Sequence, residues 1–255
     1  MLAVERLTAI IEALNASDCV SVSELSRAFS VTEETIRRDL DKIVNSDRSV
    51  VRVHGGAYKI KTFDREAPYQ LRETLLVEEK DRIARRSFTM LDDGDTIMLD
   101  SSTTALHLAT FIKDSPLKIS VITNSLRIAS ELSDCAHTNL ILTGGTYRPA
   151  SRSFVGYAAT NTLDAFHADK AFVSCSGLHE RFGLTDNSEG EAQVRRMMLM
   201  NSDFRYLLID SDKYGRCKSH RIAHLDGMQA IFSDREPDDG LKALLLKNQV
   251  ELIVC

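Results

Sequence analysis

The sequence predicts an α/β protein in which a small N-terminal winged helix-turn-helix domain precedes a larger α/β domain. Helical patterns followed by a short β-hairpin occupy residues 1–60, a polar segment with one proline occupies residues 61–74, and apolar strands alternate with helical stretches over residues 75–255. Such alternation is typical of βαβ units, which build a mainly parallel sheet with helices on both faces. We therefore expect two domains joined by a linker at 61–74.

The composition is that of an ordinary soluble protein. The chain of 255 residues is 43% hydrophobic and 27% charged, with a net charge of −5, so its total charge does not indicate a nucleic-acid partner. Apolar runs such as ISVIT are too short to span a bilayer, and MLAVERLTAI lacks the pattern of a signal peptide. The five cysteines are scattered. We therefore expect a cytoplasmic protein with no membrane association, disulfide framework, metal site or cofactor.

The first sixty residues contain the spacing of three helices. Leu7, Ile10, Ile11 and Leu14 recur at helical intervals. Ser21 and Glu24 are three residues apart before the next apolar positions, which predicts a capping box at the start of a second helix. Thr32 can cap a third helix, in which Ile36, Leu40 and Ile43 share one face. The following segment, SVVRVHGGAYKI, alternates β-branched residues around a glycine pair and predicts a hairpin.

In a winged helix-turn-helix, the third helix enters the DNA major groove and the hairpin is the wing. Arginine heads can contact guanine edges or phosphates, and threonine hydroxyls in the first helical turn can reach the backbone. The candidate DNA-contacting residues are Thr32, Thr35, Arg37, Arg38, Arg52 and His54. The alternative is a helical bundle with a solvated charged face. Residues 1–60 hold eight Lys/Arg and nine Asp/Glu, which leaves a net charge of −1 and does not exclude that alternative.

The larger domain places polar residues after several predicted strands. Strands are predicted at residues 95–99 and in KISVIT, NLILTGG, KAFVSCSG, YLLID and ELIVC, with helices at 103–112, 125–133, 156–166, 189–201 and 239–247. Ligands of open parallel sheets bind beyond the carboxyl ends of the strands. Asp100, Ser101, Ser102, Thr103 and Thr104 join one strand to a helix start, where free N–H groups and the helix dipole favour an anion.

Further polar residues follow the other strands of this domain. The additional candidates are Thr123, Asn124, Gly144, Gly145 and Lys213, with Lys80 on the preceding helix. Asp100 and Asn124 can exchange hydrogen bonds with sugar hydroxyls. Taken singly, each of these residues is explained as a turn or a helix cap, but the convergence of several strand ends on one edge favours a binding site.

Two motifs in the first sixty residues resemble the DeoR family of bacterial transcription regulators. TEETIRRDLDKI is similar to the recognition helix of that family, and VVRVHGGA is similar to its wing. NSDRSV departs from the glycine-containing turn that family members usually have. The resemblance implies that this domain binds double-stranded operator DNA.

The resemblance continues through EEKDRIARRS, GDTIMLDSSTT, VITNS, LTGGTYR, VGYAA, ADKAFVSCSGL, GLTDNSEGEAQVRRMM and DSDKYG. It implies a Rossmann-like effector domain that looks like ribose-5-phosphate isomerase and binds a phosphorylated sugar. By motif, Ser101, Ser102, Thr103 and Thr104 would hold the phosphate with Lys80 and Lys213 nearby, and Asn124, Gly145 and Glu191 would line the remainder. Glu191 resembles the position of the isomerase's catalytic carboxylate, and a solvent-facing or capping residue is the alternative.

Two positions depart from the family pattern. Ser102 stands where DeoR proteins usually have glycine, so it could narrow the phosphate site or supply a hydroxyl. Asp212 beside Lys213 would partly offset the lysine charge. Both changes imply an altered effector or weaker phosphate binding.

The resulting hypothesis is a non-enzymatic regulator, expected to be a repressor of sugar catabolism genes whose DNA binding is controlled by a phosphorylated sugar. Helix-turn-helix proteins usually bind paired half-sites, so we expect a homo-oligomer, either a dimer or a tetramer. One alternative is an active sugar-phosphate isomerase fused to a DNA-binding module, with Glu191 as its carboxylate. A third is a constitutive DNA-binding protein whose second domain binds no ligand.

Overall fold

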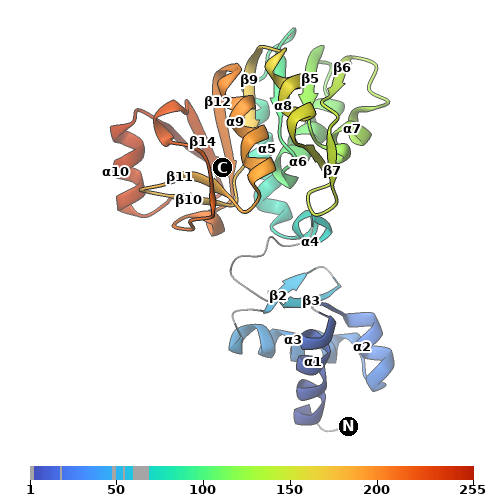
Figure 1. The fold of residues 1–255 in the computed structure, drawn as a ribbon. Helices are drawn as coiled ribbons and strands as arrows, with labels where there is room; N and C mark the ends of the chain where they lie inside the picture. Colours follow the sequence, from blue (N-terminus) through green and yellow to red (C-terminus); the bar gives the residue numbers. More distant parts are fainter. Residues whose placement is uncertain (1–2, 18, 48–49, 54, 60–68) are drawn as a thin grey trace. The chain divides into compact units, whose positions relative to one another are not determined.

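The chain divides into two compact units, Met1–Leu75 and Leu76–Cys255. The computed structural model describes residues 3–17, 19–47, 50–53, 55–59 and 69–255 (Figure 1). Of the predicted linker at 61–74, residues 61–68 lie outside the described residues, and Tyr69–Thr74 form helix α4.

Among the described residues of the N-terminal unit, three helices and a three-stranded antiparallel sheet precede α4. The elements are α1 (Ala3–Ser17), β1 (Cys19–Ser21), α2 (Val22–Phe29), α3 (Glu33–Ser46), β2 (Val50–Val53) and β3 (Gly56–Lys59). The strand order is β1-β3-β2, so the predicted hairpin gains a third strand, β1, that we did not predict. This arrangement confirms the predicted winged helix-turn-helix domain.

The two predicted helix starts have different outcomes. Thr32 caps α3, because its side chain accepts a hydrogen bond from the Thr35 N–H at 3.3 Å. The predicted capping box of Ser21 and Glu24 is wrong: Ser21 precedes α2 but its hydroxyl makes no cap bond and lies 2.9 Å from the Ser23 hydroxyl. The hairpin satisfies this helix start instead, since the Val22 N–H donates to the Gly55 carbonyl at 2.7 Å.

The glycine pair of the hairpin has a steric reason. Gly56 pairs with Ser21 of β1, and a Cβ at Gly56 would lie 2.0 Å from the Val20 carbonyl oxygen. No side chain fits that space, so glycine at this position allows the third strand to form.

Seven parallel strands form the central sheet of the second unit. In sheet order they are β15 (Glu251–Val254), β14 (Ala230–Ser233), β12 (Ser202–Ile209), β9 (Ala168–Val173), β4 (Thr96–Leu99), β5 (Ile119–Thr123) and β6 (Thr138–Leu142). Six of them were predicted, and β14 was missed because its four residues are set between polar segments. The sheet confirms the predicted α/β class.

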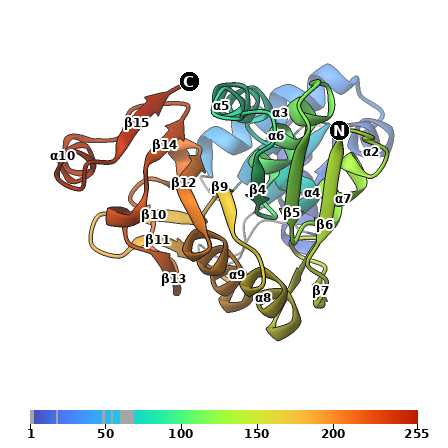
Figure 2. The same ribbon diagram turned by 90° about the horizontal axis from the view of Figure 1, so that it is seen from above.

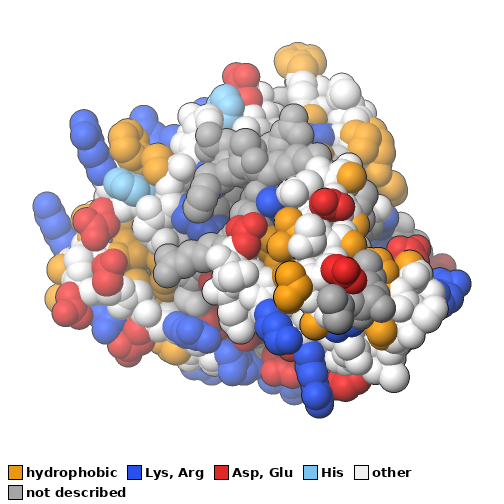
Figure 3. All heavy atoms as spheres, turned by 90° about the horizontal axis from the view of Figure 1, so that it is seen from below, with side chains coloured by type: hydrophobic (Ala, Val, Ile, Leu, Met, Phe, Trp, Pro, Cys, Tyr) orange, Lys and Arg blue, Asp and Glu red, His pale blue; other side chains and the backbone are white. Residues whose placement is uncertain are grey.

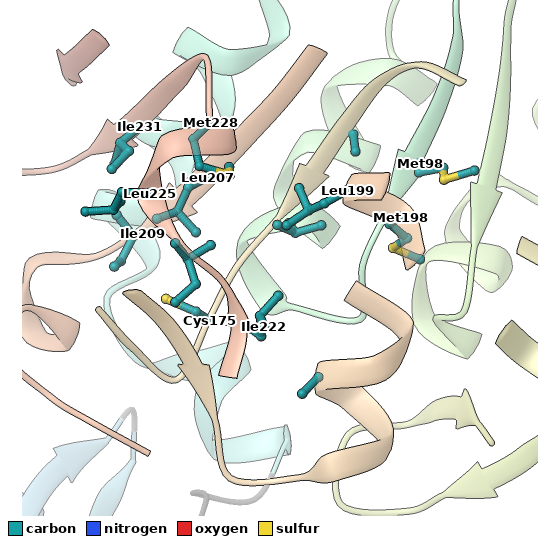
Figure 4. Close-up of a cluster of buried hydrophobic side chains, with 14 of the residues drawn as sticks. Met98, Cys175, Met198, Leu199, Leu207, Ile209, Ile222, Leu225, Met228 and Ile231 are labelled. Carbon is teal, nitrogen blue, oxygen red and sulfur yellow. The ribbon is translucent and has the colours of Figure 1, made fainter. Parts of the chain in front are cut away.

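Helices cover both faces of this sheet (Figures 1 and 2). Apolar residues of α5 (Val77–Phe88), α6 (Thr103–Lys113) and α7 (Leu126–Leu132) share one core with Ile97 and Leu99 of β4. Residues of α8 (Tyr157–Asp164), α9 (Glu189–Met200) and α10 (Asp239–Lys247) share the other core with Met98. Successive strand residues point to opposite faces, so one apolar strand supplies both cores. Figure 4 shows the second core, in which Met198 and Leu199 of α9 lie near the sheet side chains.

Shorter elements connect the strands and helices of this unit. They are the hairpin β7 (Thr146–Arg148) and β8 (Ser153–Val155), the antiparallel strands β10 (Gly177–His179), β11 (Gly183–Asp186) and β13 (His220–Ala223), and the 3-10 turns η1 (Ser211–Lys213) and η2 (Leu225–Gly227). Over the part of the chain that the structure describes, none of the helices has the length and apolar character needed to span a bilayer.

A buried ion pair joins α1 to the third helix of the N-terminal unit. The Arg6 Nε donates to the Asp39 carboxylate at 2.6 Å, and both side chains are more than nine-tenths buried. Asp39 is the aspartate of the motif TIRRDL. Its neighbours Ile36 and Leu40 belong to the small apolar core with Ile10 and Leu14 of α1. Ion pairing and apolar packing therefore fix α3 against α1 together.

We expect Asp39→Ala to destabilise the N-terminal unit by about 3–5 kcal/mol, because Arg6 would stay buried without a counter-charge. Chemical denaturation of the full chain, followed by circular dichroism, measures this loss. Glu12→Ala on the exposed side of α1 is the matched control and should change the unfolding free energy by less than about 0.5 kcal/mol. Equal effects of the two substitutions would contradict a structural role for the buried pair.

Candidate functional site

The N-terminal candidate residues lie at the start of α3 and on the β2–β3 hairpin. Thr32 is exposed and Thr35 half-buried, and their hydroxyl oxygens are 2.9 Å apart. Arg37 and Arg38 are exposed, whereas Ile36 on the same turn is fully buried. The helix therefore packs with one side and leaves the predicted DNA-contacting side chains open to solvent.

Each described arginine of this set is paired with an acidic side chain. Arg37 Nη2 donates to Glu33 at 2.7 Å, and Arg38 Nε donates to Glu34 at 3.2 Å. Arg52 of the hairpin lies 3.1 Å from Asp41 of α3 and donates to the Gly56 carbonyl at 2.9 Å. We call Arg37–Glu33, Arg38–Glu34 and Arg52–Asp41 the recognition-face ion pairs. His54 lies outside the described residues.

On the one face drawn in Figure 3, basic and acidic side chains lie interspersed among the coloured residues rather than gathered by sign. This mixture agrees with the net charge of −1 for residues 1–60. Any attraction of this unit for a polyanion therefore depends on individual residues rather than on a broad positive field.

The second group of candidates lies at the carboxyl edge of the parallel sheet. Asp100 to Thr104 follow β4, Asn124 follows β5, Gly145 follows β6 and Lys213 follows β12. Because these strands are parallel, their carboxyl ends share one edge of the sheet. Glu191 and Lys80 come from helices α9 and α5.

Asp100 is the most heavily bonded of these residues. One oxygen accepts from the Ser102 N–H at 3.0 Å, and the other accepts from the Ser174 N–H at 2.9 Å and from Arg195 Nε at 2.5 Å. Arg195 also donates to Asp186 of β11 at 2.5 Å. Both oxygens of the fully buried Asp100 already accept protein donors. This favours a positioning role over the predicted contact with a sugar hydroxyl.

The charges in this cluster stabilise one another against burial. Burial by itself raises the pKa of the Asp100 carboxyl, but Arg195 and the hydrogen bonds from Ser102 and Ser174 lower that pKa more, so the net shift is downward. The pKa of Arg195 is held well above its ordinary value by Asp100, Asp186 and Glu191, against the opposing effect of burial. Asp100 and Arg195 are therefore both charged at neutral pH.

Glu191 is buried and joins two segments at the carboxyl edge of the sheet. Its Oε2 accepts from Ser101 at 2.9 Å, and its Oε1 accepts from Ser151 at 2.6 Å and Ser153 at 2.5 Å. Ser101 belongs to the β4–α6 connection, whereas Ser151 and Ser153 belong to the β7–β8 hairpin. The side chain is 1% exposed, so the solvent-facing alternative is wrong.

At the start of α6, some polar groups form hydrogen bonds within the helix and others have no acceptor there. Ser102 is the N-cap, with φ −73° and ψ 154°, and its hydroxyl accepts from the Ala105 N–H at 3.1 Å. This backbone conformation needs no glycine, so Ser102 supplies a capping hydroxyl where the family usually has Gly. Thr103 and Thr104 occupy the first turn, where N–H groups lack acceptors within the helix.

Three buried side-chain oxygens at this edge have no hydrogen-bond partner among the described residues. They are Thr104 Oγ1, Asn124 Oδ1 and, at the end of β14, Ser233 Oγ. The Asn124 amide donates to the Phe154 carbonyl at 3.1 Å, which fixes the direction of the side chain. A buried polar group without a partner costs about 1–3 kcal/mol, so these oxygens are expected to bond to water or to a bound ligand.

Lys213 brings a cation to the same edge. Its Nζ lies 2.9 Å from Asp210 and donates to Ser174 Oγ at 3.2 Å. The carboxylate that offsets Lys213 is therefore that of Asp210, not the adjacent Asp212 as predicted. Burial raises the pKa of Asp210. Lys213 and the buried Lys80 lower that pKa by more than burial raises it, so the net shift is downward.

Gly145 has a backbone conformation that requires glycine. Its φ is +114°, and a Cβ would lie 2.8 Å from the Val155 carbonyl oxygen. Glycine therefore permits the close approach of the β7–β8 hairpin to the end of β6.

Several residues of this cluster were not predicted. They are Ser151, Ser153, Ser174, Asp186, Arg195 and Asp210. Arg195 follows Glu191 by four residues, so both occupy one face of α9. That spacing was a usable signal for Arg195. Ser151 and Ser153 carry none, since their partner Glu191 is 40 and 38 residues away.

Both units match known protein families. Residues 6–63 match the DeoR-like helix-turn-helix domain, and residues 76–235 match the DeoR C-terminal sensor domain. The chain is 39% identical over 245 residues to the uncharacterized HTH-type transcriptional regulator YulB of Bacillus subtilis, covering 96% of this chain and 94% of that protein. It is 33% identical to the L-fucose operon activator of Haemophilus influenzae, with coverage of 91% and 92%. Its identity to the HTH-type transcriptional repressor GlcR of B. subtilis is 30%, with coverage of 98% and 95%.

Among solved structures, ribose 5-phosphate isomerase A of Methanocaldococcus jannaschii is similar with a TM-score of 0.40 and 17% sequence identity, over 53% of each chain.

We expect Arg195→Met to lower the unfolding free energy by about 3–5 kcal/mol near pH 7, because Asp100 and Asp186 would stay buried without their cation. In the wild type the depressed Asp100 pKa gives stability that is present above about pH 4 and is lost as the pH falls further. In the variant, burial would raise that pKa, so acidification relieves the unpaired charge. The difference between the two proteins should therefore narrow as the pH falls from about 7 towards 4.

Urea unfolding at several pH values measures this difference. Arg196→Met is the matched control, because Arg196 donates to the backbone carbonyls of Arg221 and Ile222 rather than to carboxylates. A difference that stays constant with pH would contradict the assigned charge pairing.

Proposed function

The chain belongs to the DeoR family of transcriptional regulators, and from this premise we propose that it binds operator DNA under the control of a phosphorylated sugar. The N-terminal unit would read DNA with α3 and the β2–β3 hairpin. The carboxyl edge of the second sheet would bind the effector. The observation that carries the effector assignment is the pair of buried open oxygens, Thr104 Oγ1 and Asn124 Oδ1, at the sheet edge that also holds Lys213.

The chemistry of these groups supports a phosphorylated polyol. The Asn124 oxygen can only accept, so it needs a donor such as a sugar hydroxyl. The α6 N-terminus offers N–H donors and a positive dipole end, which suit a phosphate, and Lys213 and Lys80 add positive charge. The relative named as an L-fucose operon activator supports regulation of carbohydrate genes, and the relative named as a transcriptional repressor supports repression. We propose repression as the mode of action.

Regulation requires that the effector shift the DNA-binding equilibrium. A ligand does so only if it binds one arrangement of the protein more tightly than another. We propose a homo-oligomer, since paired half-sites need two helix-turn-helix domains. We propose the cytoplasm as its location, because bacterial DNA is there.

The rival proposal of an active isomerase is disfavoured by the bonding of Glu191. Its carboxylate already accepts from Ser101, Ser151 and Ser153 and is buried. A general base must reach a substrate proton, and this buried carboxylate is already held by three serine hydroxyls. A panel of pentose and hexose phosphates tests the point. Turnover that Glu191→Gln abolishes would favour the isomerase.

For DNA binding, we expect Arg37→Ala and Arg38→Ala each to weaken operator affinity by about 10–100-fold, since a bidentate arginine–guanine contact contributes about 1–3 kcal/mol. The operator is first selected from a random duplex library with the wild-type chain, and affinities are then measured by fluorescence anisotropy. Arg181→Ala, an exposed arginine of the second unit, controls for the loss of one positive charge and should bind normally. Unchanged affinity in both recognition-helix variants would reject this interface.

For effector binding, we expect Thr104→Val to leave the stability of the free protein nearly unchanged, because the lost hydroxyl has no partner among the described residues. The same substitution should reduce the thermal stabilisation by a bound sugar phosphate by several degrees, as one hydrogen bond contributes about 1 kcal/mol. Ser202→Ala is the control: Ser202 begins β12, at the opposite edge of the sheet, and its buried hydroxyl donates to the Met198 carbonyl at 2.8 Å.

The control variant should therefore melt at a lower temperature but keep the full ligand-induced shift. A thermal-shift screen of the wild type against sugar phosphates comes first. If no compound stabilises the wild type, the constitutive alternative is favoured.

A further inference from the structure

The recognition-face ion pairs place negative charge where a DNA-binding domain is expected to be positive. Glu33 and Glu34 occupy the first turn of α3, and each holds one arginine of TIRRDL. Arg37 also lies 4.0 Å from Glu34, so the two pairs share one charge-balanced cluster. The third pair repeats the arrangement on the hairpin, where Asp41 faces Arg52 at 3.1 Å.

Helix stability explains part of this pattern. Carboxylates in the first turn interact favourably with the helix dipole, and a glutamate four residues before a cation stabilises a helix by a few tenths of a kcal/mol. These effects account for acidic residues at the helix start. They do not require that the partners be the two arginines predicted to contact DNA.

The bonding pattern separates two properties of an arginine. Non-specific DNA binding depends almost entirely on positive charge near the phosphates, whereas base reading depends on hydrogen bonds of defined geometry. A guanidinium has five N–H donors, and the bond from Arg38 to Glu34 uses Nε. Arg38 therefore has its charge locally balanced while both terminal nitrogens stay available for a guanine edge. Arg37 donates to Glu33 through Nη2, so a guanine edge would meet its remaining N–H groups.

We propose that Glu33 and Glu34 are specificity determinants that suppress binding to non-operator DNA by balancing the charge of Arg37 and Arg38. This inference rests on the proposed DNA-binding function. On non-operator DNA, each arginine would have to leave its glutamate for a phosphate, and the freed carboxylate would lie close to the polyanion. On the operator, hydrogen bonds to bases are gained without the loss of the ion pair.

The test compares Glu33→Gln, Glu34→Gln and the double variant with the wild-type full chain. Glutamine is similar in size and polarity but carries no charge. We expect the double variant to bind random-sequence duplex about tenfold more tightly and to show a steeper dependence of affinity on salt, because two arginines become free to displace counterions. Operator affinity should change by less than about threefold, so the ratio of specific to non-specific affinity falls.

Glu12→Gln on α1 is the matched control. It removes one negative charge from an exposed site of the same unit, and it should leave the specificity ratio unchanged. Circular dichroism melting confirms that α3 stays folded in each variant.

Three outcomes would overturn the inference. The first is an equal gain on operator and random duplex. The second is a weaker operator complex with no gain on random duplex, which would mean that the glutamates orient the arginines or read a base directly. The third is the same effect from Glu12→Gln. Failure of the proposed function gives a different result, because the wild-type chain would then select no sequence from the random library.

Discussion

The buried contact between Arg195 and Asp100 determines the geometry of the carboxyl edge of the parallel sheet. Asp100 ends β4, and its two oxygens also hold the backbone N–H groups of Ser102 and Ser174. One carboxylate thereby fixes the start of α6 and the end of β9 at once. Arg195 comes from α9 and reaches Asp186 of β11 as well, so three separate segments meet at one guanidinium. A buried carboxylate without a counter-charge would be costly. Arg195 supplies that charge and allows this polar cluster to be buried at the edge of an apolar sheet.

The chain contains ion pairs in two opposite environments. Arg195–Asp100 and Arg6–Asp39 are buried and organise packing. The pairs of Arg37 and Arg38 are about half or more exposed, where solvent screening makes the free energy of each pair small. Exposed pairs of this kind can be exchanged for other partners at little cost, whereas the buried ones cannot. The same chemistry therefore holds the fold in one place and stays available for binding in the other.

Local signals predicted most of the fold. The alternation of strands and helices identified six of the seven parallel strands, and Thr32 marked the start of α3 correctly. The predictions were wrong or incomplete where a distant segment decides the outcome. Ser21 matches a capping box, but β1 pairs with the hairpin and satisfies that helix start. The partner of Asp100 is 95 residues away, and no spacing rule connects them. The order of strands and helices predicted that the candidate residues lie at one edge of the sheet. Tertiary contacts decide which of them form hydrogen bonds or ion pairs within the chain.

The anchoring of α3 has a consequence for how such regulators can diverge. Ile36, Asp39 and Leu40 attach the helix to α1, while Glu33, Glu34, Arg37 and Arg38 take no part in the core. The two sets interleave along the chain but occupy different sides of the helix. A gene duplicate could therefore acquire a new target sequence by changing only the outer set, with the attachment of the helix preserved. The residues that attach α3 to the core and the residues that face solvent can therefore change independently of each other.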